Sequence, residues 1–102
     1  MAKIITSANF ESEIGQAKTP VLVDFWATWC GPCQRQGIIL EDMVKDGFPI
    51  AKIDVDAEPE LARRFRVMSI PTLIVFKDGQ EEVKRLVGLH NRTQLEEALA
   101  QA

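Results

Sequence analysis

Short apolar runs alternate with segments of helical spacing along the chain. The clearest run is Val21–Trp26, which is apolar on both faces apart from Asp24 and therefore predicts a strand covered on each side. Other strands are predicted at residues 3–5, 48–55, 72–76 and 82–87. Because Asp78-Gly79 favours a tight hairpin, the last strand is expected to be an antiparallel edge strand, with Gly88 after it.

Segments with apolar residues three or four positions apart separate these strands. They predict helices at residues 10–17, 32–45 and 58–65, and a last helix that begins after Asn91. The expected N-caps are Thr6 or Ser7 for the first helix, Asp56 for the third, and an Asn91–Gln94 capping box for the last. The buried stripe of the second helix is expected to be Ile38, Ile39, Leu40, Met43 and Val44, and that of the last Leu95, Ala98 and Leu99.

The resulting element order is β-α-β-α-β-α-β-β-α, which predicts an α/β fold. We expect a central mixed sheet of about five strands flanked by about four helices, with helices on both faces. The 102 residues fit a single domain, residues 1–102. The formal net charge of −3 argues against nucleic-acid binding. No apolar run is long enough to span a membrane, and the first residues do not resemble a secretory signal.

The only cysteines, Cys30 and Cys33, lie in the segment Trp29-Cys30-Gly31-Pro32-Cys33. A structural disulfide that closes so short a loop would contribute roughly 2 kcal/mol, against about 3 kcal/mol for a 15-residue loop. A zinc site needs four ligands, and His90 is the only histidine. A redox-active dithiol is therefore the favoured interpretation, because C-x-x-C in a βαβ setting is typical of that chemistry.

The positions of the two cysteines predict different chemical roles for them. Cys30 is expected at the start of a helix, where free backbone N–H groups and the helix dipole favour a thiolate. Cys33 lies one turn further on and is expected to be more buried and protonated until it attacks Cys30. Gly31 and Pro32 add neither charge nor hydrogen-bond donor that would strongly stabilise the thiolate, which favours a reductant over a strong oxidant.

Asp24 is the polar residue that the strand pattern does not explain. Burial would raise its pKa into the range useful for proton transfer, so it could take the proton from Cys33 through water. It could instead face solvent or be satisfied by a lysine, for which Lys52 is a candidate; Lys52 could also be an ordinary exposed strand residue. His90 and the segment 63–66 are expected at the surface.

Two further residues stand near the predicted site. Trp29 could shield the sulfur of Cys30 or offer apolar surface to a substrate. Pro71 opens a predicted strand, and a trans peptide bond before it is expected from the general frequency of cis proline.

Together these residues resemble the thioredoxin family. The resemblance rests on residues 29–33, on residues 23–27 before them, on Ile70-Pro71-Thr72, on Lys77-Asp78-Gly79 and on Val87-Gly88. It implies the thioredoxin fold and a general protein-disulfide reductase. It also implies that Asp24 is the buried acid–base residue with Lys52 beside it, and that Pro71 is cis and lies against the sulfurs.

The resemblance further implies how this chain would meet its partners. Trp29, Ile70, Pro71 and Gly88 would form the apolar surface that docks disulfide-containing protein substrates. Electrons would come from a thioredoxin reductase, a flavoprotein that uses NADPH, and the chain itself would bind no cofactor or metal. We expect a cytoplasmic monomer. A disulfide oxidant or isomerase would favour a histidine between the cysteines, and a chaperone or binding subunit of this fold would not need both cysteines.

Two residues depart from the family pattern. Gln34 follows the second cysteine where the family usually has lysine, and the missing charge is expected to raise the pKa of Cys30 or to alter the choice of partner. Ile38 stands where the family usually has a helix-kinking proline, so a straighter helix is expected.

Overall fold

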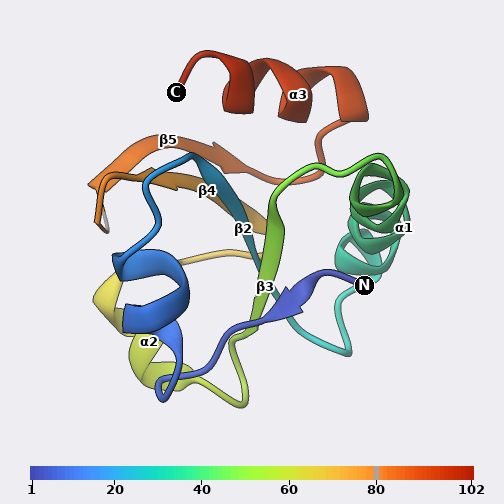
Figure 1. The fold of residues 1–102 in the computed structure, drawn as a ribbon. Coiled ribbons are helices and arrows are strands. Elements are labelled where there is room, and N and C mark those ends of the chain that lie inside the picture. The colour runs from blue at the N-terminus through green and yellow to red at the C-terminus, as the bar shows by residue number, and fades with distance from the viewer. Residues whose placement is uncertain (80) are drawn as a thin grey trace.

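A five-stranded mixed sheet lies between two pairs of helices in the computed structural model, which describes residues 1–79 and 81–102 (Figure 1). The strands are β1 (Lys3–Ile4), β2 (Val21–Trp26), β3 (Ile50–Asp54), β4 (Thr72–Lys77) and β5 (Glu81–Val87). The helices are η1 (Glu11–Gly15), α1 (Gly31–Lys45), α2 (Pro59–Arg64) and α3 (Arg92–Ala100). The predicted α/β fold is confirmed.

The strand order is β1-β3-β2-β4-β5. Strand β3 is parallel to both β1 and β2, whereas β4 is antiparallel to its neighbours β2 and β5. Strand β2 is therefore central, and its carboxyl end leads directly into the turn before α1. This is the edge at which open α/β sheets place their functional groups.

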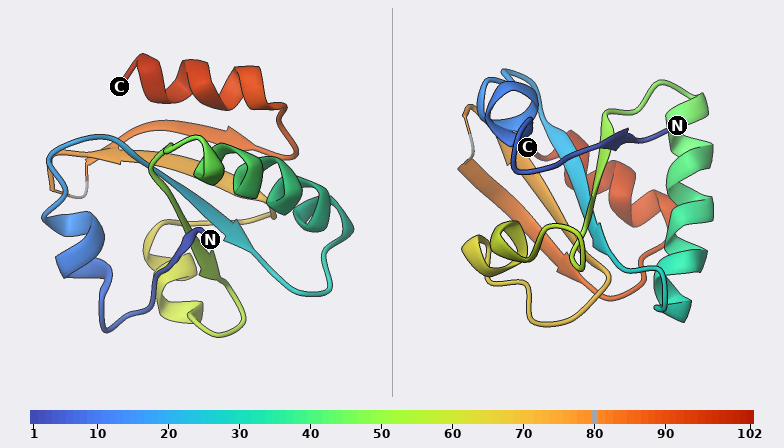
Figure 2. Two further views of the ribbon diagram at one scale, coloured as in Figure 1. Left: turned by 45° about the vertical axis from the view of Figure 1, so that its right-hand side comes forward. Right: turned by 90° about the horizontal axis from the view of Figure 1, so that it is seen from below.

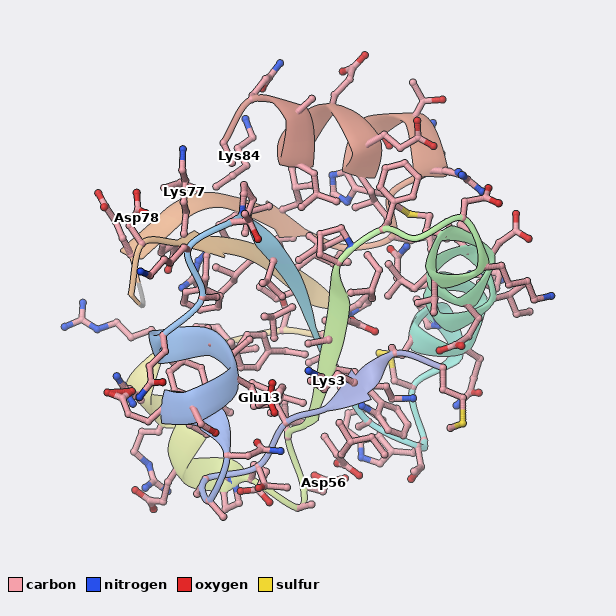
Figure 3. The ribbon with its side chains drawn as sticks, viewed as in Figure 1. Lys3, Glu13, Asp56, Lys77, Asp78 and Lys84 are labelled. Carbon is pink, nitrogen blue, oxygen red and sulfur yellow. A yellow bond between two sulfur atoms is a disulfide. The ribbon has the colours of Figure 1, made fainter. Side chains whose placement is uncertain are left out.

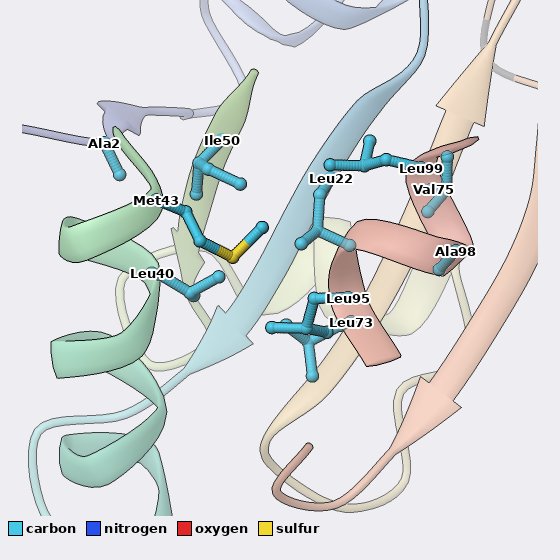
Figure 4. Packing of buried hydrophobic residues seen from close by; sticks show 10 residues of the cluster. All are labelled: Ala2, Leu22, Leu40, Met43, Ile50, Leu73, Val75, Leu95, Ala98 and Leu99. Carbon is cyan, nitrogen blue, oxygen red and sulfur yellow. The ribbon is translucent and has the colours of Figure 1, made fainter. Parts of the chain in front are cut away.

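Alternate residues of the central strands supply two separate cores. Leu22 points toward α1 and α3, whereas Val23 and Phe25 point toward η1 and α2. Figure 2 shows these two helix pairs on opposite sides of the sheet. The first core is drawn in Figure 4 and consists of Ala2, Leu22, Leu40, Met43, Ile50, Leu73, Val75, Leu95, Ala98 and Leu99.

The turn between β4 and β5 and the N-terminus of α3 have the backbone angles and hydrogen bonds that the sequence predicts. Asp78 and Gly79 have positive φ angles of 52° and 73°, as a tight turn between antiparallel strands requires. Figure 3 shows Lys77 and Asp78 pointing outward at this hairpin. Asn91 Oδ1 accepts a hydrogen bond from the Gln94 N–H at 2.9 Å, and Gln94 Oε1 accepts one from the Asn91 N–H at 2.9 Å. The predicted hairpin turn and capping box are thus confirmed.

The caps predicted for the first helix are wrong. Only a short π-helix forms there, and its N-cap, Phe10, makes no side-chain cap bond. Asn9 Oδ1 accepts from the Thr6 N–H at 2.7 Å, so an asparagine organises the turn instead. The Ser7 hydroxyl donates to Glu58 Oε1 at 2.8 Å, because the long-range carboxylate outcompetes a local cap.

The cap predicted for α2 is also wrong. Glu58 precedes α2 and makes no side-chain cap bond. Asp54 Oδ1 instead accepts hydrogen bonds from the backbone N–H groups of Asp56 at 2.9 Å and Ala57 at 3.3 Å. The Asp56 carboxylate does not cap α2 and instead accepts a hydrogen bond from the indole N–H of Trp29, the residue before Cys30.

The buried face of α1 differs from the predicted one at two positions. Ile38 is 74% exposed, whereas Gln36 is completely buried. Cys33, Gln36, Leu40 and Met43 follow each other at spacings of three and four residues and so share the inward face. Two residues correspond to about 200° around a helix, which turns Ile38 away from the face that holds Gln36 and Leu40.

Surface ion pairs join peripheral elements. Lys3 of β1 lies 2.7 Å from Glu13 of η1, and Figure 3 shows the two side chains side by side. Arg92 at the start of α3 pairs with Asp46 just after α1 at 2.6 Å. Exposed pairs of this kind contribute at most about 1 kcal/mol each, so the two cores dominate stability. None of the helices in the described part of the chain has the length and apolar character to cross a bilayer.

The reassigned face of α1 can be tested with two matched substitutions. Leu40→Ala should lower the free energy of unfolding by about 2–5 kcal/mol, because it opens a cavity in the first core. Ile38→Ala should change it by less than about 0.5 kcal/mol, because the side chain is exposed. Urea denaturation measures both values. Equal losses for the two variants would contradict the structure.

Candidate active site

The two cysteines lie where the turn after β2 becomes helix α1. Cys30 is the N-cap of α1 and has extended backbone angles, with φ at −90° and ψ at 113°. Its sulfur accepts a hydrogen bond from the Cys33 N–H at 3.2 Å, so a sulfur occupies the place usually taken by a serine or aspartate oxygen. Cys30 and Cys33 form a disulfide with their Cα atoms 5.2 Å apart.

The disulfide lies at the rim of the fold. Cys30 is 6% exposed and Cys33 is 3% exposed, so the expected order of burial is present but the difference is small. Gly31 and Pro32 between them are exposed. A Cβ added at Gly31 would meet no atom within 4 Å, so this position faces open space.

The loop before β4 lies against the first sulfur. The Ile70 carbonyl oxygen is 3.8 Å from Cys30 Sγ. The Ile70–Pro71 peptide bond is cis, as the family resemblance implies and against the general frequency of trans bonds. Pro71 is buried, and its carbonyl accepts a hydrogen bond from the Gly88 N–H at 2.8 Å. The structure thus brings together the candidate residues from three separate segments of the chain.

Asp24 lies inside the protein beneath the start of α1. It is 3% exposed, and within residues 1–79 and 81–102 its Oδ1 atom has no hydrogen-bond partner. Burial raises its pKa from 3.8 to about 7, while the positive charge of Lys52 acts in the opposite direction. The alternative of a surface aspartate is therefore wrong.

Lys52 is the register partner of Asp24 on the neighbouring strand β3. It is half-buried, and its ammonium nitrogen lies 4.3 Å from the centre of the Trp26 ring. The ring face attracts the cation and covers its stem. Lys52 is thus not an ordinary exposed strand lysine; it acts on Asp24 through its charge.

A cavity of about 480 Å³ connects this buried pair to the disulfide and to solvent. Asp24, Lys52 and Trp26 line it from the sheet, and Cys33 and further residues of α1 line it from the helix. A water molecule occupies about 30 Å³ in the liquid, so the cavity can hold a chain of them. The cavity therefore leaves room for water between Cys33 and Asp24.

The family model for thioredoxin matches residues 1–101. The chain belongs to the thioredoxin family. It is 50% identical over 94 residues to the thioredoxin of Mycobacterium bovis, covering 89% of this chain and 80% of that protein. It is 48% identical over 99 residues to the thioredoxin of Alicyclobacillus acidocaldarius, covering 94% and 92%.

A third relative combines two activities in one protein. The bifunctional thioredoxin reductase/thioredoxin of Mycobacterium leprae is 47% identical over 94 residues, which cover 89% of this chain and 20% of that protein. As a thioredoxin-family member, the present chain is a protein-disulfide oxidoreductase. Its redox group is the Cys30–Cys33 disulfide and not a bound cofactor.

An apolar hollow adjoins the thioredoxin-type disulfide. Trp29 is 71% exposed, and its indole N–H donates to Asp56 Oδ2 at 2.8 Å, which holds the ring in place. A hollow of about 360 Å³ is lined by Trp29, Val55, Val67, Met68, Ser69 and Ile70. Met68 is 92% exposed, and the sequence gives no sign of this, because a lone methionine in a loop carries no periodic signal.

The other candidates have structural partners. His90 is half-buried, and its ring Nδ1 lies 2.8 Å from the Gly88 carbonyl oxygen. No group of three or more His, Cys, Asp or Glu side chains in the described residues could hold a metal ion. Gln34, which replaces the usual thioredoxin lysine, donates from its amide to the Thr28 carbonyl at 2.9 Å. It binds the turn before the disulfide and brings no charge.

The raised pKa of Asp24 predicts how stability depends on pH. In the unfolded chain this carboxyl ionises near pH 3.8, whereas in the folded chain it keeps its proton up to about pH 7. Unfolding then releases a proton, so stability falls as the pH rises through this range and levels off above it. Asp24→Asn should remove this slope. Between pH 4 and pH 8, the free energy of unfolding of the variant relative to that of the wild type should therefore increase by on the order of 4 kcal/mol.

Urea denaturation at a series of pH values measures this difference. Lys52→Met is the companion variant: without the opposing charge, the fall in stability should extend to higher pH than in the wild-type chain. The same slope in wild type and Asp24→Asn would mean that another group is responsible.

Proposed function

We propose that this chain reduces disulfide bonds in other proteins and is in turn reduced by a thioredoxin reductase. The observation that carries the proposal is the sulfur of Cys30 at the N-cap of α1, where it accepts the Cys33 N–H. A donor aimed at this atom stabilises it as an anion, and the thiolate is the form that attacks disulfides.

The reaction proceeds in two exchanges. The Cys30 thiolate attacks one sulfur of the target disulfide; a new S–S bond forms, the old one breaks, and one target cysteine leaves as a thiolate. The Cys33 thiol then loses its proton and attacks Cys30, which releases the second target thiolate. Two electrons pass to the target, and the chain ends with the Cys30–Cys33 disulfide.

Asp24 is proposed to accept the proton that Cys33 loses. Its pKa of about 7 suits proton exchange near neutral pH, and the cavity supplies a path for water between the two side chains. Lys52 limits how far burial raises that pKa. Gly31 and Pro32 leave the thiolate without further stabilising groups, which supports action as a reductant.

Trp29, Ile70, Pro71 and Gly88 are proposed to dock the substrate backbone and its apolar side chains. Trp29, which is exposed, lines the same hollow as Ile70, and the Gly88 N–H is hydrogen-bonded to the Pro71 carbonyl. A Cβ at Gly88 would meet no atom within 4 Å, so this position opens to the surface.

The reductase partner is supported by the protein from Mycobacterium leprae, in which a thioredoxin reductase and a thioredoxin form one chain. In this proposal FAD and NADPH belong to the reductase. We further propose that residues 1–102 act as a single domain and as a monomer. The reducing cytoplasm is the proposed compartment, because such compartments keep dithiols reduced.

The two exchanges predict different fates for two serine variants. Cys33→Ser should attack a protein disulfide but fail to release it, so a mixed disulfide should accumulate at one substrate per chain. Cys30→Ser should form at least about 100-fold less adduct, because the activated thiolate is gone. Mass spectrometry before and after dithiothreitol measures the adduct, and insulin reduction measures turnover. Wild-type turnover by Cys33→Ser would contradict the proposed resolving step.

A further inference from the structure

Gln36 is the one wholly buried amide among the residues of α1, and the redox chemistry described above does not use it. Its Nε2 group donates to the His90 carbonyl at 3.1 Å, and its Oε1 atom accepts from the His90 N–H at 2.9 Å. An amide without these partners would be strongly unfavourable in so buried a position. The side chain thus forms a two-bond clamp on a backbone segment 54 residues away.

The clamped segment continues to the candidate docking surface. The ring Nδ1 of His90 lies 2.8 Å from the Gly88 carbonyl oxygen, and the Gly88 N–H donates to the Pro71 carbonyl at 2.8 Å. Hydrogen bonds therefore connect α1 with Gly88 and Pro71 without a break. Gly88 has a φ of 94°, so its backbone conformation is one that other residues rarely adopt.

Gln36 and the disulfide are fixed to the same helix. Gln36 follows Cys33 by three residues, which is nearly one turn, and both side chains lie on the inward face. Val87 and Leu89 on either side of Gly88 are 58% and 42% exposed. The clamp consequently sets where an exposed apolar segment lies relative to the sulfurs.

We propose that Gln36 is a positioning residue for protein substrates: its amide holds residues 88–90 against α1 so that they form one wall of the docking surface beside Pro71. This inference rests on the proposed reductase function. A small disulfide that reaches only Cys30 does not contact residues 88–90. A protein substrate does contact them, because its chain extends beyond the reacting sulfur.

Steady-state kinetics on two kinds of disulfide separate this role from a general one. Gln36→Met keeps the length of the side chain and removes both hydrogen bonds. Its KM for a protein disulfide such as insulin should rise about 3- to 10-fold, because binding must then order a loosened segment, which costs about as much as immobilising one side chain. Its kcat on insulin, and its kcat/KM for 5,5′-dithiobis(2-nitrobenzoate), should stay within about twofold of wild type.

Gln94→Met is the matched control. It removes the capping-box bond to the Asn91 N–H, just after the clamped segment, and leaves the bonds from Gln36 to His90 in place. This variant should unfold at lower denaturant concentration but keep the wild-type KM for insulin. A rise in KM for both variants would show that loss of stability is responsible, and would overturn the proposal.

Gln36→Leu is a second variant for the case that Gln36→Met does not fold. It also removes both hydrogen bonds and places no charge against the His90 carbonyl, so its KM for insulin should rise as it does for Gln36→Met. Hydrogen exchange of the His90 amide should become at least about tenfold faster in Gln36→Met. A wild-type KM in a variant whose His90 amide exchanges faster would overturn the proposal.

The wild-type chain distinguishes failure of the proposed reductase function from failure of the role proposed for Gln36. A wild-type chain that reduces the small disulfide but not insulin would overturn both the reductase proposal and the role of Gln36. Normal insulin reduction by the wild type, with an unchanged KM in the Gln36 variants, would overturn the role of Gln36 alone.

Discussion

The hydrogen bond from the Cys33 amide to the Cys30 sulfur is the interaction on which the chemistry of this molecule depends. It exists because the N-terminal N–H groups of a helix have no partners within the helix, and because Cys30 takes the N-cap position. Leu40 and Met43 further along α1 are buried against the sheet and fix the position of the helix. Core packing on one face of the sheet thus keeps the Cys33 N–H within hydrogen-bond distance of the Cys30 sulfur.

The alternation of side chains along β2 explains why Asp24 is buried. Asp24 follows Leu22 by two residues in β2 and therefore faces the same core, beneath α1. A carboxylate there loses much of its hydration, and the positive charge of Lys52 offsets part of that loss. The fold thereby gives the proposed acid–base residue a pKa near neutrality in a cavity that Cys33 also lines, and the loss of stability that this causes grows from about pH 4 to about pH 7.

Most of the fold is predictable from motifs of neighbouring residues. The features that the sequence does not predict depend on contacts between residues far apart in the chain. The cysteine motif, the apolar strand with Asp24 and the Asn91 capping box are each read from adjacent residues. The exposure of Ile38 is not predictable from the pattern, because the apolar residues around it do not mark one face of the helix. The role of Gln36 is not predictable either, because its hydrogen-bond partner lies 54 residues away. The cis bond before Pro71 followed only from the family resemblance, since no local rule demands it.

Titration of the reduced thiols tests the central interaction most directly. Absorbance of the thiolate near 240 nm, recorded against pH for the Cys33→Ser variant, reports the pKa of Cys30 alone. The account predicts a pKa clearly below the value of about 8.5 for an unperturbed cysteine, with a return toward that value in urea. A folded protein whose Cys30 titrates at or above the unfolded value would contradict it.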